Sequence, residues 1–364
     1  MIEPGKFNCK MLFSFIDLCA GIGGTRTAFE KVGGYCVYAS EIDKFASKTY
    51  KSNFHHNPYS NLFDVNPHII PQHDILVAGF PCQPFSLSGV TKRKSLEKPH
   101  GFEWREKGQI FFKIVEIIKE KKPAAFLLEN VKHLKYHNNG ETFDIIREQL
   151  QDVGYDIFES IIDAQLLVPQ HRERLYIVGF KKELKIKFIF PSIPKVYPKL
   201  KTILEVNPDV KYTISDKLWN YLQEYKKIHR KKGNGFGYGL AVLEGKTRTL
   251  SARYFKDGAE ILIPQEGKNP RKLTPRECAR LMGFDDTFII PVSNCQAYKQ
   301  FGNSVAIPIV EYIAWEIVKC LFKNQSPLTY LFNESTESDQ YSSNGELGTS
   351  MPSLGELEII QAIH

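Results

Sequence analysis

The sequence predicts an α/β protein with a larger first part, residues 1–184, and a second, smaller domain at 185–270. Two observations lead to this prediction. Short apolar runs at residues 12–18, 75–78 and 124–130 alternate with polar or helical stretches, as the buried strands of an α/β sheet do. Beyond the first part this alternation stops, and a segment rich in Lys, Tyr, Pro and Gly indicates irregular loops.

With 364 residues, the chain is long enough for two domains with a sizeable core. Its hydrophobic content of 42% is ordinary for a soluble globular protein, and no apolar run approaches the ~20 residues of a membrane span. The N-terminal residues lack the order of a secretory signal, so we expect a cytoplasmic protein. The seven cysteines include no Cys-x-x-Cys pair, so we expect neither a disulfide framework nor a metal site.

The net charge of +7 is unevenly distributed along the chain. Residues 324–364 contain six acids and no Lys or Arg, and their Ser, Asn and Glu content predicts a disordered tail. Residues 1–323 therefore carry 48 basic and 35 acidic side chains, a net charge of +13. A basic body suggests a nucleic-acid partner, although a solvated basic face is the commoner explanation of any single Lys run.

The first strand, residues 12–18, leads into a glycine turn at 19–24, a helix at 25–32 and a second strand at 35–40 that ends before Glu41. Glycines let the backbone approach a ligand, and the N-terminus of the helix favours a negative group. An acid about 20 residues beyond the glycines can accept hydrogen bonds from ribose hydroxyls, as in dinucleotide sites. The pattern is G-x-G-G and not G-x-G-x-x-G, so a tight turn that needs glycine is the alternative.

The strand at 75–78 runs into the sequence Gly-Phe-Pro-Cys-Gln-Pro-Phe-Ser at residues 79–86. Pro81 and Pro84 stiffen this loop and hold Cys82 between them, at the carboxyl end of a predicted strand, where α/β sheets bind ligands. A polarizable nucleophile on a stiff loop suits covalent catalysis. The alternative is that Cys82 is a small buried residue, as free cysteines usually are.

Polar residues also stand next to two later strands. Glu129 and Asn130 end an apolar strand, and a carboxylate there is either paired in the core or part of a site; we favour the site. Arg172 and Arg174 open another strand, and two arginines on one strand face can hold a phosphate. The alternative for the arginines is a surface ion pair with Glu173 or a neighbour.

Apolar periodicity predicts the remaining elements. They are a polar loop at 87–108, helices at 109–122, 141–153, 273–284 and 306–323, and strands at 155–162 and 175–180. Thr274 and Pro275 are the predicted N-cap and first residue of their helix. The basic run 226–232 and the glycine-aromatic segment 233–239 suit a nucleic-acid groove, or else a solvated helix followed by a turn.

Six blocks in this order make the chain resemble the DNA cytosine-5 methyltransferases over residues 13–323. The blocks are residues 17–24, 79–86, 129–131, 170–174, 271–284 and 300–305. The resemblance implies a Rossmann-like, S-adenosylmethionine-dependent methyltransferase fold, a mixed sheet flanked by helices. Residues 1–184, completed by 303–323, would form the catalytic domain, 185–270 a target-recognition domain, and 271–302 the hinge and returning helix.

The resemblance implies transfer of a methyl group from S-adenosylmethionine to C5 of a cytosine that is flipped out of a duplex. Cytosine C5 is a poor nucleophile, and addition of the Cys82 thiolate at C6 would make it enamine-like. Glu129, protonated or sharing a proton, would stabilise N3, and Asn130 would orient the base. Arg172 or Arg174 would face O2 and the phosphate. Loss of the C5 proton and β-elimination would then free the thiol.

For the cofactor, the resemblance implies contacts from the glycine turn, from the acid after the second strand and from the last block. These residues are Asp17, Gly21, Gly23, Glu41, Asn303, Ser304 and Val305. Cys19 stands where family members usually carry an aromatic residue that packs on the adenine. Asn61 stands near the usual position of an acid that binds the adenine amine, so either Asn61 or Asp64 would serve.

Residues 233–240 and 247–262 resemble the recognition segment of Dcm-type bacterial enzymes. This implies a short palindrome with the core CC-x-GG, in which the middle pair is A/T or any base. The candidates for base or phosphate contacts are Arg248, Thr249, Arg253, Tyr254, Lys256 and Asp257. We expect a monomer that acts on double-stranded DNA, either beside a cognate restriction endonuclease encoded nearby or as an orphan methylase.

Three alternatives stay open. A tRNA-acting branch shares the catalytic blocks, although the basic insert at 185–270 favours duplex DNA. A non-catalytic nucleic-acid-binding or cofactor-sensing protein on the same fold predicts that Cys82→Ala leaves every activity intact. A nucleotide-dependent oxidoreductase rests only on the glycine turn, and it leaves Cys82 and Glu129 unexplained.

Overall fold

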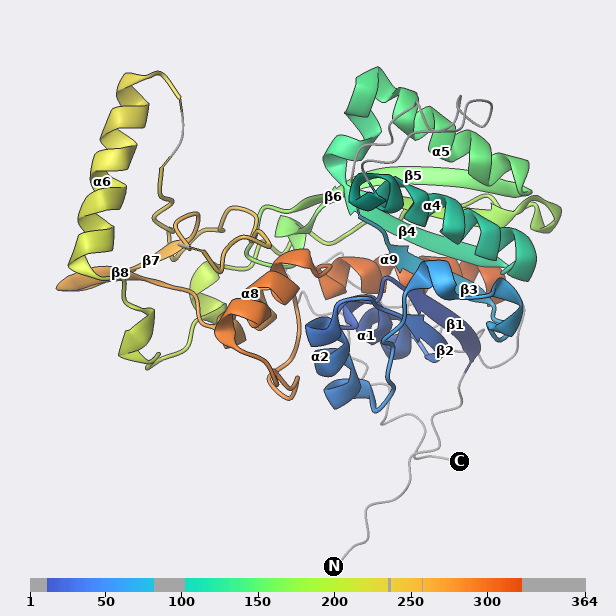
Figure 1. Ribbon diagram of the computed structural model, residues 1–364, viewed down its shortest axis with the longest axis horizontal. Helices are drawn as coiled ribbons and strands as arrows, with labels where there is room; N and C mark the ends of the chain where they lie inside the picture. The colour runs from blue at the N-terminus through green and yellow to red at the C-terminus, as the bar shows by residue number, and fades with distance from the viewer. Residues whose placement is uncertain (1–11, 82–101, 235–236, 257, 323–364) are drawn as a thin grey trace, which may run out of the picture.

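The computed structural model describes residues 12–81, 102–234, 237–256 and 258–322 (Figure 1). Cys82, Asp257 and the acidic tail at 324–364 lie outside these described residues. The predictions for the state of Cys82, for a DNA contact by Asp257 and for the tail therefore stay predictions.

A six-stranded mixed sheet forms the centre of the molecule, in the strand order β2-β1-β3-β4-β6-β5. Its strands are β1 (Phe13–Leu18), β2 (Gly34–Ser40), β3 (Ile75–Gly79), β4 (Ala125–Val131), β5 (Tyr155–Asp163) and β6 (Glu173–Lys181). β1 to β4 are parallel, and β6 lies antiparallel between β4 and β5. The mixed sheet that the family resemblance implied is confirmed.

Helices cover both faces of this sheet (Figure 1). The α-helices of the described ranges are α1 (Gly24–Lys31), α2 (Lys44–Phe54), α4 (Phe102–Lys121), α5 (Glu141–Asp152), α6 (Asp216–Lys231), α7 (Pro275–Leu281), α8 (Asn294–Asn303) and α9 (Ile307–Phe322). α1 and α9 pack on the face that carries Phe15 and Val77, and α4 and α5 on the face that carries Ile16 and Leu76. Alternate residues of a strand point to opposite faces, so a strand buried on both faces must be apolar throughout.

After β6 the chain leaves the sheet and forms a second lobe, at the left of Figure 1. There β7 (Leu262–Gln265) and β8 (Lys268–Lys272) pair antiparallel, and α6 stands beside them. Ile214, Leu222, Ala259 and Leu262 form a small separate core in this lobe. The chain then returns to the sheet through α7, α8 and α9.

The structure differs from the predicted elements in three ways. Residues 102–108, predicted as loop, are the first part of α4; they lack apolar periodicity but continue the helix that follows. Residues 216–231 form α6 where irregular loops were predicted, so the helix kept as the alternative for 226–232 is the one observed. α2 and α8 were not predicted, because each buries polar residues, such as Thr49 and Gln300, beside only a short set of apolar ones.

None of the helices in the described ranges combines the length and the hydropathy that a membrane span requires. Within the same ranges, no three His, Cys, Asp or Glu side chains gather in a way that could hold a metal ion.

Candidate active site

A cavity of about 420 Å³ lies at the carboxyl ends of β1, β3 and β4, where α/β sheets bind their ligands. Glu41 and the glycine turn line one end of this cavity, together with Asn303, Ser304 and Val305. Glu129 lines the other end. Six of the nine predicted cofactor residues and the four described catalytic residues therefore line one space of a size usual for small-molecule sites.

The glycine turn is held in place by the carboxylate of Glu41. Glu41 accepts a hydrogen bond from the N–H of Gly21 and another from the N–H of Asp43, each at 2.7 Å. Gly21 and Gly23 have φ values of 55° and 85°, in the left-handed region that favours glycine. Gly21 lines the cavity, whereas Gly23 faces Phe54, whose ring would lie 2.1 Å from a Cβ at Gly23.

This end of the cavity fits S-adenosylmethionine. Burial raises the pKa of the Glu41 carboxyl, and its two backbone donors act in the opposite direction. Each carboxylate oxygen keeps a lone pair that can accept a ribose hydroxyl. Asn61 lines the cavity, whereas Asp64 is exposed and is not part of its wall. Cys19 also lines the cavity, at the position where relatives in the family were expected to place an aromatic ring.

Asp17 lies within β1 and, unlike Gly21 and Glu41, does not line the cavity. Its side chain is fully buried, and neither carboxylate oxygen has a well-formed hydrogen bond to a described residue. Burial raises the pKa of Asp17 to about 8, although the guanidinium and backbone N–H of Arg26 act in the opposite direction. At neutral pH the protonated form is therefore favoured, and a cofactor contact by Asp17 stays a prediction.

Glu129 and Arg174 form an ion pair at the other end of the cavity. Glu129 is in register with Gly79, the last residue of β3, which leads toward Cys82. Arg174 Nε lies 3.1 Å from Glu129 Oε1. Burial raises the pKa of Glu129, while the charges of Arg174 and Arg172 lower it, and the net shift is upward. A carboxyl group in this environment can hold a proton for delivery to a base nitrogen.

Asn130 supports the start of the loop that carries Cys82. Its side-chain Nδ2 donates to the backbone oxygen of Phe80 at 2.9 Å, and its Oδ1 accepts from the N–H of Val131 at 2.8 Å. The side chain is buried, so both of its polar atoms are engaged within the protein. The structure thus ties β4 to the residue before Pro81, and the predicted contact of Asn130 with a base stays a prediction.

Arg172 and Arg174, expected on one strand face, make different contacts. β6 begins at Glu173, so Arg172 precedes the strand and the alternation rule does not extend to it. The buried Arg172 guanidinium donates to the backbone oxygens of Leu250, Gly302 and Ser304, at 3.1, 3.1 and 2.6 Å respectively. Burial lowers the pKa of Arg172 to about 9. Although Arg172 borders the cavity, the structure uses its two terminal nitrogens to join three chain segments.

Sequence reasoning missed Gln170, the first residue of the same block. Its Nε2 donates to the backbone oxygen of Leu281 at 3.3 Å, and its Oε1 accepts from the N–H of Leu250 at 2.8 Å. It also missed the ion pair between Lys299 and Asp43, 2.7 Å apart, which stands at the cavity wall. Gln170 could have been found from the sequence, because it stands in the same block as Arg172. Nothing in the sequence indicates that Lys299 pairs with Asp43.

The predicted recognition segment, residues 233–240 and 247–262, is described except at 235–236 and 257, and it presents Arg248, Arg253 and Lys256 as exposed side chains. Thr249 is bound to the protein, because its hydroxyl donates to the backbone oxygen of His171 at 2.6 Å. Among the described members of the predicted set, the exposed cations are therefore the ones best placed to meet a phosphate or a base edge.

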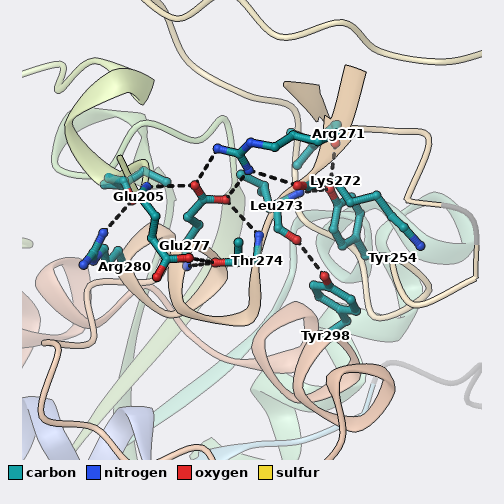
Figure 2. Close-up of polar contacts among 11 residues, drawn as sticks. Glu205, Tyr254, Arg271, Lys272, Leu273, Thr274, Glu277, Arg280 and Tyr298 are labelled. Atoms are coloured by element: carbon teal, nitrogen blue, oxygen red, sulfur yellow. Dashed lines mark hydrogen bonds and ion pairs between the residues drawn. The ribbon is translucent and has the colours of Figure 1, made fainter. Parts of the chain in front are cut away.

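Tyr254 lies inside the protein, contrary to the expectation that it contacts DNA. Its hydroxyl donates to the backbone oxygen of Ile261 at 2.7 Å and accepts from the N–H of Leu273 at 2.8 Å. Its ring packs edge-on against Tyr298, whose hydroxyl donates to the oxygen of Leu273 at 2.6 Å (Figure 2). Aromatic character alone does not distinguish a base-stacking residue from a core residue.

A buried ion pair fixes the connection from β8 to α7 (Figure 2). Arg271 donates to both carboxylate oxygens of Glu277 at 2.7 Å, and both side chains are almost completely buried. Glu277 also completes the capping box of Thr274, which confirms the predicted N-cap. The connection between the second lobe and the returning helices is therefore a well-anchored unit.

Comparisons with known proteins identify the family to which this chain is similar. A family model described as C-5 cytosine-specific DNA methylase matches residues 13–319. The chain is 44% identical to the DNA-cytosine methyltransferase of Escherichia coli strain K12, covering 86% of this chain and 79% of that protein. It is 50% identical to Type II methyltransferase M.SsoII of Shigella sonnei, covering 85% and 81%. The crystal structure of S. pombe Dnmt2 methyltransferase, at 19% identity, shares the fold with a TM-score of 0.67 over 85% of this chain and 99% of that one.

Proposed function

The chain belongs to the C-5 cytosine-specific DNA methylases, and on this premise we propose that it methylates a cytosine in a short palindrome with the core CC-x-GG. It is a DNA cytosine-C5 methyltransferase that uses S-adenosylmethionine. The proposal adds the target, CCWGG or CCNGG, and a covalent adduct of Cys82. The observation that best supports the proposed chemistry is the largely enclosed Glu129–Arg174 pair, which shares one cavity with Glu41 and the glycine turn.

The proposed reaction begins at Cys82. Its thiolate adds to C6 of a flipped cytosine, forming an S–C6 bond, and the displaced electron pair moves toward N3 and O2. Glu129 donates its proton to N3, and Arg174 stabilises the charge at O2. S-adenosylmethionine, when bound, supplies an electrophilic methyl group. Once C5 carries the methyl group, the donor is left as the thioether S-adenosylhomocysteine, and N3 returns its proton to Glu129. A water molecule takes the C5 proton, the C5–H electron pair re-forms the C5=C6 bond, and the Cys82 thiolate leaves C6.

Glu41 and the glycine turn would hold the cofactor, with Asn61, Asn303, Ser304 and Val305 along the same wall. This assignment is supported by their position in the wall of the cavity that Glu129 also lines. Arg172 would act through the backbone of the segment that contains Ser304, and Asn130 through the backbone of Phe80. We assign both residues to positioning in the proposed mechanism.

The segment 185–270 is proposed as the target-recognition domain, in a monomeric, cytoplasmic enzyme. Arg248, Arg253 and Lys256 would contact the duplex, because they are exposed cations in the segment that resembles Dcm-type enzymes. A cognate restriction endonuclease encoded nearby would make the protein the modification half of a pair. Without one it would act as an orphan methylase.

The test is transfer of a labelled methyl group to matched duplexes that carry CCAGG, CCGGG or a scrambled site, with tRNA as a second substrate. We expect the CCAGG duplex to be labelled, and neither the scrambled duplex nor the tRNA. Labelling of CCAGG alone would select CCWGG, and labelling of both would select CCNGG. Transfer to tRNA but not to DNA would overturn the proposal.

A further inference from the structure

Helix α6 stands apart from the rest of the second lobe. Its N-terminal end lies beside β8, and its C-terminal end is remote from the other labelled elements (Figure 1). One side of the helix is anchored, because Leu222 is buried in the small core and Leu218 and Trp219 pack against it. A helix attached by one side and one end leaves the remaining surface available to a partner.

The available surface is basic. Residues 216–232 contain six Lys or Arg residues and two acids, a net charge of +4. Lys226 and Arg230, and likewise Lys227 and Lys231, are four residues apart and therefore lie along one side of the helix. Lys232 follows directly. We call these five residues the α6 basic stripe.

Most of the stripe has no counter-charge within the protein. Lys227 pairs with Glu224 at 2.6 Å, and the Lys226 ammonium lies 4.0 Å from the ring centroid of Tyr238. Arg230, Lys231 and Lys232 are exposed and make no ion pair with any residue that the structure describes. Three adjacent unneutralised cations at a free helix end repel one another, and a polyanion would relieve that repulsion.

The stripe begins next to the predicted recognition segment. A Cβ at Gly237 would lie 2.9 Å from Cγ of Lys226, and a Cβ at Gly239 would lie 3.6 Å from Nε of Arg248. Lys226 therefore lies beside Gly237, and Arg248 lies beside Gly239, two residues further along the chain. The α6 basic stripe therefore begins close to Arg248, one of the exposed cations of the recognition segment.

We propose that the α6 basic stripe binds backbone phosphates of the duplex beyond the target palindrome. This inference rests on the proposed function, because that function brings a duplex to Arg248. Residues 226–232 span about 9 Å of helix at ~1.5 Å per residue, and duplex DNA carries one phosphate charge per ~1.7 Å of its axis, so several phosphates can lie along the stripe. Phosphate contacts of this kind add affinity without reading sequence. An acidic protein is the less favoured partner, because the stripe continues from residues proposed to meet DNA.

The test is equilibrium binding of the full chain to two duplexes that carry the same central site. One extends about 3 base pairs on either side of the site and the other about 12, so that only the second spans more than one helical turn beyond it. The variant R230A/K231A/K232A removes three charges and keeps good helix formers. The charge-conserving variant R230K/K231R/K232R is one control. K119A/K122A/K187A, which removes three exposed charges at the opposite edge of the sheet from the cavity, is the other.

We expect R230A/K231A/K232A to bind the long duplex about ten-fold more weakly than the wild type at moderate salt. Its salt slope on the long duplex should fall by about 2 to 3, roughly 0.9 for each lost phosphate contact. Its affinity for the short duplex and its single-turnover methylation rate should be unchanged. Both control variants should match the wild type on both duplexes.

Equal losses on the two duplexes, or no loss on the long one, would overturn the inference. The wild-type protein separates this failure from failure of the proposed function. If it methylates the short duplex while α6 has no effect on the long one, only the role of α6 is wrong. If it methylates neither duplex, the proposed function itself is wrong.

Discussion

Glu129 and Arg174 occupy a largely enclosed position, where two charged side chains are best tolerated as a pair. The carboxylate and guanidinium are 3.1 Å apart, so each reduces the cost of burying the other. Burial nevertheless outweighs this attraction and raises the pKa of Glu129. Glu129 is therefore suited to donate a proton to a neutral base, while Arg174 remains charged and able to stabilise an oxygen.

Replacing Glu129 by Gln should test the proton donor. Gln has the same shape but cannot transfer a proton, so we expect the single-turnover methylation rate to fall by between about 100- and 10,000-fold. Thermal unfolding should change little. Glu159→Gln, which alters a carboxylate paired with Arg147 outside the cavity, is the matched control and should retain the wild-type rate. A rate close to wild type for Glu129→Gln would remove Glu129 from the mechanism.

The pH profile gives an independent test of the same residue. The active form of Glu129 is protonated, so the rate should decline as the pH rises through the raised pKa of this carboxyl group. The single-turnover rate of the wild type, measured against pH, should show this decline at higher pH than an ordinary glutamic acid would. In Glu129→Gln the decline should be absent, and its persistence would assign it to another group.

Arg172 and Arg174 should respond differently to the same substitution. Arg172→Lys cannot reach the backbone oxygens of Leu250, Gly302 and Ser304 from one nitrogen, so the free energy of unfolding should fall by about 2–4 kcal/mol. Its dissociation constant for S-adenosylmethionine should also rise. Arg174→Lys should cost about 1 kcal/mol or less and chiefly lower kcat. Chemical denaturation and cofactor titration distinguish the two, and identical effects would contradict the separate assignments.

At the scale of elements, the predicted recognition segment lies directly on the C-terminal end of α8. A Cβ at Gly302 would lie 2.4 Å from the backbone carbon and oxygen of Ser251. Arg172 bridges the same two segments, through the oxygens of Leu250 and Gly302. The segment proposed to contact DNA and residues 303–305, which are proposed to contact the cofactor, are thus separated by one layer of packed backbone.

Gly302→Ala should disturb both the C-terminal end of α8 and the recognition segment at Ser251 that packs on it. The added methyl group cannot be accommodated without moving backbone, so we expect an unfolding free energy lower by about 1–3 kcal/mol. Affinity for the cofactor and for a CC-x-GG duplex should both weaken. Gly245→Ala, whose Cβ would meet its neighbours at an ordinary 3.5 Å, should behave like the wild type in all three measurements. Loss of DNA binding with unchanged cofactor affinity would show that this contact does not serve both sites.

The elements that could be predicted are those whose residues face one environment along their whole length. β1, β3 and β4 are buried on both faces and read as apolar runs, and α9 is a long, mostly apolar helix. α2 and α8 bury Thr49 against Gln300 through a hydrogen bond, a pairing between distant residues that no local pattern encodes. α6 has a narrow apolar side, so its basic residues dominate its composition.

The candidate site shows the same division. Glu129, Asn130 and the glycine turn follow predicted strands, so their convergence at one sheet edge could be expected from the fold class. The separate directions of Arg172 and Arg174 could not, because they depend on where β6 begins. The burial of Tyr254 depends on Leu273 and Tyr298, which are distant in sequence.

At the scale of the whole molecule, the chain divides into a sheet that carries the cavity and a lobe that carries exposed cations (Figure 1). The net charge of +13 on residues 1–323 favours approach of a polyanion at a distance, and this attraction weakens as salt rises. A flipped base would bridge the two parts, since the phosphates would meet the lobe while the base entered the cavity.

The most direct test of the account is covalent trapping on a CC-x-GG duplex in which the target cytosine is replaced by 5-fluorocytosine. Fluorine at C5 cannot leave as a proton does, so elimination of the Cys82 sulfur should be blocked after methyl transfer. We predict a denaturation-resistant one-to-one complex for the wild type and for Cys295→Ala, an exposed thiol, and none for Cys82→Ala. A wild-type protein that methylates the ordinary duplex but forms no such complex would contradict the covalent mechanism.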